Sequence, residues 1–281
     1  MYKTNHFDGF NNIRIFYRSW LPKRPKAIVL LVHGAGEHSE RYRHIAEFFL
    51  KEDIAVVSPD LRGFGKSEGI RGHVNTFADY LHDLEILIQK IRKDNPCIPL
   101  FLFGHSLGGL IVIRYVQQFP DLTNGVILSS PALELRVQIP FLAKKLLGTV
   151  SVLTPGLSIQ PTRWRKLAEK FPILEPYLPK EKTLQQDPLI TAEYTARWLT
   201  ELMKNGMQAI AEGALFRFPL LCVYDQKDPI VHPRSIQLFL DSVSIPEKGL
   251  VSFDEGYHHP WHARYQDKAI DKLMIWLKSQ L

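Results

Sequence analysis

An unbroken apolar run at residues 27–32, Ala-Ile-Val-Leu-Leu-Val, constrains the fold of this chain more than any other feature. Its β-branched residues favour a strand, and both faces of that strand would be apolar. Such a strand belongs in the middle of a parallel sheet that helices cover on both sides. Comparable runs occur at residues 54–58, 99–103, 125–129 and 218–224.

Segments with the apolar spacing of amphipathic helices separate these runs. They span residues 41–52, 76–93, 110–119, 234–240 and 264–278, with one more strand-like run at 249–253. Strands that alternate with helices predict an α/β fold with a mostly parallel, doubly covered sheet. Residues 6–20 instead alternate apolar and polar side chains around Asn11-Asn12, which predicts an antiparallel hairpin at the start.

The alternation stops between residues 131 and 216, where prolines punctuate helix-like pieces and no buried strand is recognisable. A structureless loop of this length would be unusual in a compact domain. We therefore expect a core formed by residues 1–130 and 217–281, with an inserted helical cap at residues 131–216.

Charge and cysteine usage narrow the functional classes. The net charge is +6, but the lysines and arginines are scattered, so we expect no nucleic-acid partner. Cys97 and Cys222 lie far apart without metal-ligand spacing, and we expect no disulfide, metal or cofactor. The N-terminus lacks a signal peptide, and Lys144, Lys145 and Pro155 interrupt the longest apolar segment, so a cytoplasmic protein is expected. The oligomeric state has no signature in the sequence.

A short motif, Gly104-His105-Ser106-Leu107-Gly108, follows the strand-like run at 99–103 directly. Gly-x-Ser-x-Gly between a strand and a helix is a nucleophile elbow, in which a sharp turn projects the serine from the end of the sheet. The two glycines fit because a Cβ at either place would collide with the neighbouring strand or helix. Five matching residues also occur by chance, so the interpretation of Ser106 as a nucleophile depends on finding its partners.

A serine nucleophile needs a base and an acid that orients the base, and in this topology they follow in the order Ser, Asp, His. The acid is expected after the run at 218–224, where Asp228 is preferred to Asp225. The base is expected after residues 249–253, where His258 and His259 are adjacent. His258 is the first choice, and the alternative stays open.

An acyl-transfer site also needs two backbone N–H groups to bind an oxyanion. One comes from the residue after the nucleophile, Leu107, and the other from the turn after an earlier strand. In that turn, His33-Gly34-Ala35-Gly36, the N–H of Ala35 is the candidate.

With these motifs the chain resembles the α/β-hydrolases of the monoacylglycerol lipase and lysophospholipase type, which are also called serine aminopeptidase S33-like. The resemblance covers nearly the whole chain. Its motifs are residues 33–39 with 41–42, 60–67, 104–109, 187–189 and 257–258, together with Asp228. Residues 33–39, His-Gly-Ala-Gly-Glu-His-Ser, are the most discriminating of these motifs, because many unrelated hydrolases share the elbow.

This resemblance implies the α/β-hydrolase fold and a serine esterase acting on single-chain lipids, either monoacylglycerols or lysophospholipids. It also implies that Glu37 and Arg41 lie near the polar head group of the lipid; the alternative is an ordinary surface ion pair. The same triad would serve a carboxylesterase, a thioesterase or a peptidase. A non-catalytic ligand-binding protein is a third class, against which the complete Ser, Asp, His order argues. The chain departs from the family in carrying Asp225 near a usual glycine, and Trp261 where some relatives have histidine.

The cap contains an apolar band from Ile139 to Leu157 with Lys144 and Lys145 inside it, and Arg163, Arg165 and Lys166 follow. Such a band is typical of a lid that rests on an anionic membrane, which would make the protein peripherally membrane-associated. It is equally typical of a face packed against the core.

Overall fold

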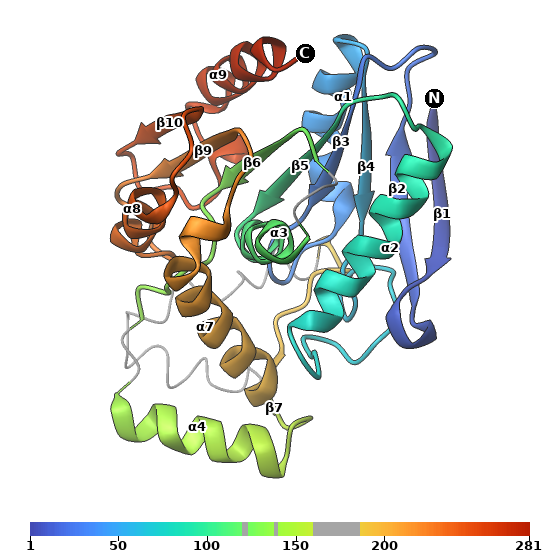
Figure 1. The fold of residues 1–281 in the computed structure, drawn as a ribbon. Helices are drawn as coiled ribbons and strands as arrows, with labels where there is room; N and C mark the ends of the chain where they lie inside the picture. Colours follow the sequence, from blue (N-terminus) through green and yellow to red (C-terminus); the bar gives the residue numbers. More distant parts are fainter. Residues whose placement is uncertain (120–122, 138–139, 160–185) are drawn as a thin grey trace.

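The centre of the structure is an eight-stranded sheet (Figure 1) in the order β1-β2-β4-β3-β5-β6-β9-β10. The computed structural model describes residues 1–119, 123–137, 140–159 and 186–281. The strands are β1 (Tyr2–Asp8), β2 (Arg14–Trp20), β3 (Ala27–Val32), β4 (Ile54–Pro59), β5 (Leu100–His105), β6 (Gly125–Ser129), β9 (Leu220–Asp225) and β10 (Lys248–Phe253). All neighbours from β4 to β10 are parallel, and only β1–β2 and β2–β4 are antiparallel. The mostly parallel sheet is confirmed.

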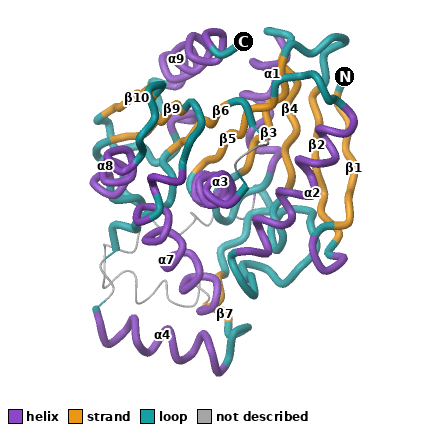
Figure 2. The backbone as a smooth tube through the Cα atoms, viewed as in Figure 1, coloured by secondary structure: helices purple, strands orange, loops and turns teal. Residues whose placement is uncertain are grey.

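Helices cover both faces of this sheet (Figures 1 and 2), as the apolar runs require. They are α1 (Arg43–Lys51), α2 (Ala78–Asp94), α3 (Leu107–Gln118), α8 (Pro233–Ser242) and α9 (Gln266–Ser279). Leu30 and Val32 of β3 belong to the apolar cluster under α2, α3 and α8, whereas Val29 and Leu31 belong to the cluster under α1 and α9. Successive residues of one strand therefore serve two cores, which explains why the run contains no polar residue.

The first two strands form the expected antiparallel hairpin, with Tyr2 opposite Trp20 and Asp8 opposite Arg14. Asn11 and Asn12 make the turn, each with φ of 59°. Asparagine tolerates this left-handed region better than most residues, so the pair suits the turn.

The segment between β6 and β9 contains α4 (Phe141–Leu153), β7 (Ser158–Ile159), β8 (Tyr194–Thr195) and α7 (Ala196–Ala211) in its described parts. Helix α7 packs on the core, because Trp198, Leu202 and Ala209 are buried in the same cluster as α2 and α3. Among the described residues, no helix is both long enough and apolar enough to span a membrane.

Helix α4 lies at the periphery of the molecule (Figure 1) and exposes most of its apolar side chains. The exposed set consists of Phe141, Leu142, Leu146, Val152 and Leu153, together with Leu157 beyond the helix. These residues belong to the apolar band predicted from the sequence, and they do not pack against the core. Ile139 and the basic residues Arg163, Arg165 and Lys166 lie outside the described residues.

Candidate active site

The elbow is a sharp turn between β5 and α3. Ser106 has φ of 50° and ψ of −114°, a strained conformation for a residue with a side chain. An added Cβ on Gly104 would lie 2.3 Å from the carbonyl oxygen of Gly108, and one on Gly108 would lie 2.1 Å from that of Val32. Backbone atoms cannot yield at such distances, so the crowding expected at both glycines is confirmed.

The side chain of Ser106 lies at the start of a short hydrogen-bond chain. Its Oγ is 3.0 Å from Nε2 of His258, and Nδ1 of His258 is 2.7 Å from Oδ2 of Asp228. Because the buried carboxylate accepts, the proton between them belongs to Nδ1, which leaves Nε2 to accept from the serine hydroxyl. The geometry thus brings together the three predicted residues, which come from the ends of β5, β9 and β10.

The two aspartates of the turn after β9 have different partners. Asp228 accepts the N–H groups of Ile230 and Val231 on Oδ1, and its Oδ2 faces the histidine. Asp225 instead accepts backbone N–H groups from Lys227 and from residues 255–257, and the hydroxyl of Tyr265. Burial alone would raise the pKa of Asp225, but these donors hold it below its ordinary value. Asp225 therefore ties the turn after β9 to the loop that carries His258.

The turn after β3 is fixed by the ring of His33. Its Nε2 accepts the N–H of Leu61 at 2.9 Å and its Nδ1 lies 2.7 Å from the carbonyl oxygen of Gly34. Burial lowers the pKa of His33, so the ring is neutral and can accept on one nitrogen and donate from the other. The N–H groups of Ala35 and Leu107 have no acceptor among the described residues, as an oxyanion hole requires.

Glu37 is held firmly beside this turn. Its Oε2 accepts the hydroxyl of Tyr42 at 2.6 Å and the N–H of Gly34 at 3.2 Å, while Oε1 lies 3.3 Å from Nε of Arg41. Burial alone would raise the pKa of Glu37, but its interactions with His259, His105 and Arg41 hold it well below the ordinary value. The side chains of Glu37 and Arg41 are partly buried, with exposed fractions of 16% and 28%.

Asp187, from the inserted segment, contacts the same loop. Its Oδ2 lies 2.9 Å from Nε2 of His38 and 3.9 Å from Nη1 of Arg41. The 60–67 turn joins this loop from the other side, because Asp60 accepts the N–H groups of Ser39 and Lys66 at 2.8 Å. Three motifs far apart in the sequence thus meet around Glu37 and His38.

His259, the alternative base, does not reach Ser106. Its Nε2 lies 3.5 Å from Oε1 of Glu37, and its ring is 4.1 Å from that of His105. Burial and the neighbouring histidines lower the pKa of His105 well below its ordinary value. The sequence did not predict that Glu37, His105 and His259 lie together, nor that Tyr42 contacts Glu37. The one signal for the group was the position of His105 inside the elbow motif.

The sheet order, the strained elbow and the Ser106–His258–Asp228 chain together define an α/β-hydrolase. Residues 23–263 match the family described as serine aminopeptidase, S33. The match covers most of the chain, so this protein belongs to that family of α/β-hydrolases.

Named relatives include lipid hydrolases. The chain is 26% identical to a monoacylglycerol lipase of Mycolicibacterium smegmatis, over 98% of this chain and 96% of the relative. It is 30% identical to the human monoglyceride lipase, over 95% and 87% of the two chains. The phospholipase YtpA of Bacillus subtilis is 29% identical, over 85% and 90%. A crystal structure of a Paleococcus ferrophilus monoacylglycerol lipase superposes with a TM-score of 0.82 at 28% identity, covering 95% of this chain and 99% of that one.

Proposed function

We propose that this protein is a serine hydrolase that cleaves the carboxylic esters of single-chain lipids, above all monoacylglycerols, to release a fatty acid and glycerol. The hydrogen-bond chain from Ser106 through His258 to Asp228 carries the proposal. The lipases and the phospholipase among its relatives support the substrate class.

In the proposed reaction, Ser106 Oγ attacks the ester carbonyl while its proton moves to Nε2 of His258. Asp228 keeps the imidazole in the required tautomer and stabilises the imidazolium that forms. The N–H groups of Ala35 and Leu107 bind the oxyanion of the tetrahedral intermediate. His258 then protonates the leaving alcohol, and a water molecule hydrolyses the acyl-enzyme by the same steps.

We assign the head group of the substrate to Glu37 and Arg41. Both side chains belong to the loop that supplies Ala35, so a polar head near them leaves the ester carbonyl close to the oxyanion hole. The Glu37 carboxylate would accept hydrogen bonds from glycerol hydroxyls, and the Arg41 guanidinium would donate to them. A lysophospholipid would place its phosphate against Arg41, but also against the negative charge of Glu37, which favours the neutral glycerol head.

A cavity of about 640 Å³ between α7, α4 and the turn after β6 offers space for the acyl chain. Leu133, Leu202 and Met207 are among its apolar lining residues. Ala132, which also lines it, donates its N–H to the backbone carbonyl oxygen of Ser106, although Ser106, His258 and Asp228 themselves do not line the cavity. A volume of this size is in the range of small-molecule sites.

We further propose that residues 131–216 act as a cap, and that α4 contacts the lipid surface from which the substrate is drawn. Phe141 and Leu142 are 69% and 78% exposed, and Lys144 and Lys145 lie on the same helix. Exposed apolar side chains beside lysines are typical of helices that bind the interface of anionic membranes.

Labelling with a fluorophosphonate probe tests the nucleophile. We expect the wild type to be labelled and Ser106→Ala to be unlabelled, with Ser252→Ala as a control that retains labelling. Hydrolysis of monoacylglycerols, lysophospholipids, thioesters and amino-acid amides then tests the substrate class. Faster turnover of amides would favour an aminopeptidase, in keeping with the family's description, and would contradict the lipid proposal.

Sedimentation with vesicles tests the contact with membranes. We expect the double variant Phe141→Ser/Leu142→Ser to bind anionic vesicles at least about tenfold more weakly than the wild type, since each buried apolar side chain contributes about 1.5–3 kcal/mol. Ile275→Ser is the matched control, because Ile275 is 66% exposed on α9. Equal loss in both variants would contradict a specific role of α4.

A further inference from the structure

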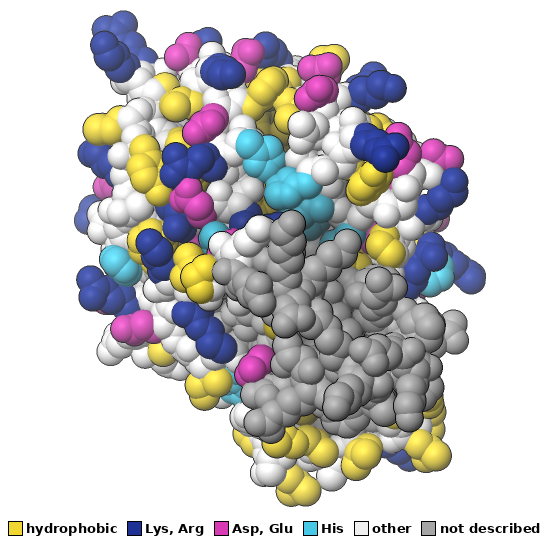
Figure 3. All heavy atoms as spheres, turned by 180° about the vertical axis from the view of Figure 1, so that it is seen from behind, with side chains coloured by type: hydrophobic (Ala, Val, Ile, Leu, Met, Phe, Trp, Pro, Cys, Tyr) yellow, Lys and Arg dark blue, Asp and Glu magenta, His cyan; other side chains and the backbone are white. Residues whose placement is uncertain are grey.

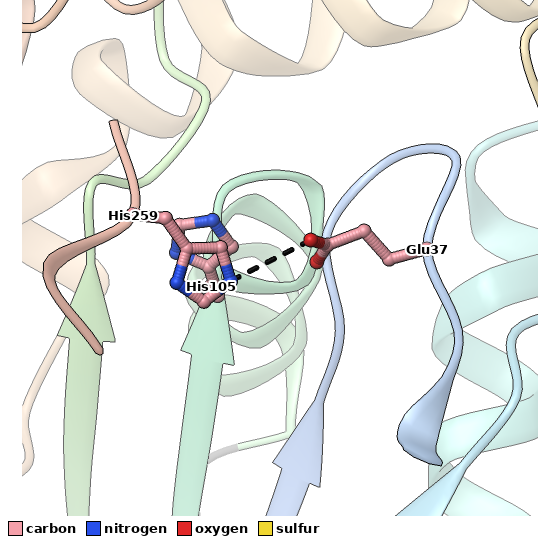
Figure 4. Close-up of side chains that lie close together, drawn as sticks. All are labelled: Glu37, His105 and His259. Atoms are coloured by element: carbon pink, nitrogen blue, oxygen red, sulfur yellow. Dashed lines mark ion pairs between the residues drawn. The ribbon is translucent and has the colours of Figure 1, made fainter. Parts of the chain in front are cut away.

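Three side chains beside the triad form a group whose chemistry the proposed hydrolysis leaves unused. Glu37 comes from the loop after β3, His105 from the end of β5 and His259 from the loop after β10 (Figure 4). Each offers one ligand atom, and these atoms all lie within 4.8 Å of one another. Because the three segments are distant in sequence, the spacing of these residues did not predict the group.

The carboxylate of Glu37 is fixed in place by one of its oxygens. Tyr42 and Gly34 donate to Oε2, so Oε1 is the oxygen that faces the two histidines. Arg41 also contacts Oε1, at 3.3 Å, but a carboxylate oxygen can accept more than one partner. Asp187, 3.9 Å from Arg41, offsets part of its charge.

His259 has the least satisfied side chain of the group. Both of its ring nitrogens are buried, and neither makes a hydrogen bond within the described part of the chain, although Nε2 lies 3.5 Å from Oε1 of Glu37. The ring lies between those of His105 and His262, with ring centroids 4.1 and 4.0 Å away. Leaving buried polar atoms unpaired costs about 1–3 kcal/mol, so this imidazole points to a ligand.

His105 is oriented as metal-binding histidines usually are. Its Nδ1 lies 2.9 Å from Oγ of Ser129, which also accepts the indole N–H of Trp261 at 2.8 Å. A partner on one ring nitrogen fixes the ring and leaves the other nitrogen for a metal. In His105 the nitrogen left over is Nε2.

We propose that Glu37, His105 and His259 bind a divalent transition-metal ion, with zinc as the reference ion. Two imidazoles and one carboxylate form a ligand set that zinc uses when a fourth position stays open. Tetrahedral zinc with bonds of about 2.0–2.1 Å separates its ligands by about 3.3 Å. The 3.5 Å between Glu37 and His259 is already close to this spacing.

The site also has exposed histidines beside it. Histidine side chains gather on one face of the molecule (Figure 3). His262 is exposed and stacks on His259, and the exposed ring of His44 lies 4.7 Å from that of His262. Exposed imidazoles therefore lie next to the proposed ligands on the side where His259 is packed.

Metal binding at this place would inhibit the enzyme, a consequence that rests on the proposed function. The bound ion would hold Glu37, which we assign to the head group. It would also lie next to the base, since the rings of His105 and His258 are 5.0 Å apart. Metal binding itself does not depend on the reaction.

Isothermal titration of zinc chloride into the full-length Ser106→Ala variant tests binding apart from activity. We expect one zinc ion per chain, with the affinity reduced at least about tenfold by His259→Gln and by Glu37→Gln. His6→Gln, which removes an exposed histidine of β1, is the matched control and should bind zinc as before. Thermal melting without metal establishes that each variant is folded. A tetrahedral absorption spectrum with cobalt, lost in His259→Gln, would support the same ligands.

Two results would overturn the metal site. One is the absence of zinc binding to the Ser106→Ala protein, which would leave the cluster as the ion pair of Glu37 with His259. The other is binding that His259→Gln and Glu37→Gln do not weaken. In the active wild type, zinc should inhibit hydrolysis and a chelator should restore it. Binding without inhibition would keep the site and contradict only its effect on the proposed reaction.

Discussion

Asp225 and Asp228 are both buried in the turn after β9. Exchange for asparagine should lower the stability of the protein at Asp225 and its catalytic activity at Asp228. In Asp225→Asn an amide nitrogen replaces one carboxylate oxygen. If it replaces Oδ2, the N–H groups of Glu255 and Tyr257 lose their acceptor and face another donor. Each unsatisfied buried donor costs about 1–3 kcal/mol, so we expect a loss of roughly 3–5 kcal/mol in the free energy of unfolding.

Asp228→Asn should leave stability nearly unchanged, because the amide oxygen can still accept the N–H groups of Ile230 and Val231. Its nitrogen would then face Nδ1 of His258 and force the proton onto Nε2. That tautomer cannot accept the proton of Ser106, and a loss in kcat on the order of 10⁴ is expected from the corresponding change in another serine hydrolase.

Thermal melting and steady-state hydrolysis of a monoacylglycerol, measured on both variants, separate the two roles. We expect Asp225→Asn to lower Tm on the order of 10 °C and to keep measurable kcat at low temperature. Asp228→Asn should melt like the wild type and be nearly inactive. If Asp225→Asn were instead the inactive but stable variant, the assignment of the acid to Asp228 would be refuted.

Three further changes test other parts of the structure. Gly108→Ala should prevent folding, because its Cβ would lie 2.1 Å from a backbone carbonyl oxygen, whereas Gly148→Ala, with nothing within 4 Å, should fold normally; soluble yield and circular dichroism measure both. Tyr42→Phe removes a hydroxyl from Glu37 and should raise KM for monoacylglycerol several-fold with little change in kcat, since about 1–2 kcal/mol of positioning is lost. An unchanged KM would contradict the assignment of Glu37 to the binding of the head group. Burial lowers the pKa of His105. Below about pH 6.5 the unfolded chain therefore binds a proton at this histidine that the folded chain does not bind. The free energy of unfolding should fall by about 1.4 kcal/mol per pH unit below that value. Urea unfolding with EDTA at pH 7.5 and 5.5 should show this slope in the wild type and a shallower one in His105→Asn.

The inner parallel strands were predictable from the sequence because burial on both faces leaves few polar residues in them. The run at 27–32 corresponds to β3 without a shift, and Ser106 could be placed from its motif between β5 and α3. The boundaries of the cap at residues 131 and 216 stay a prediction. Its exposed α4 has the same apolar composition as a buried helix, so the sequence offered no way to distinguish the two.

Side-chain direction in loops was not predictable. His258 and His259 are adjacent, and only the backbone of the loop after β10 directs one toward Ser106 and the other toward Glu37. The structural role of Asp225, which ties the turn after β9 to the loop that carries His258, was not predictable for a similar reason. Most of its partners are backbone N–H groups some 30 residues away, and every residue except proline has such a group. Such contacts leave no pattern of residue types.

The parallel pairing of β6 with β9 has a consequence for the synthesis of this chain. About 90 residues separate the two strands, and at roughly 5–20 residues per second the ribosome needs roughly 5–20 s to make them. During that interval β6, an apolar strand, is the open edge of a growing sheet. Open apolar edges pair readily with other chains. The long segment between β6 and β9 therefore leaves the nascent chain prone to aggregation at this point of translation.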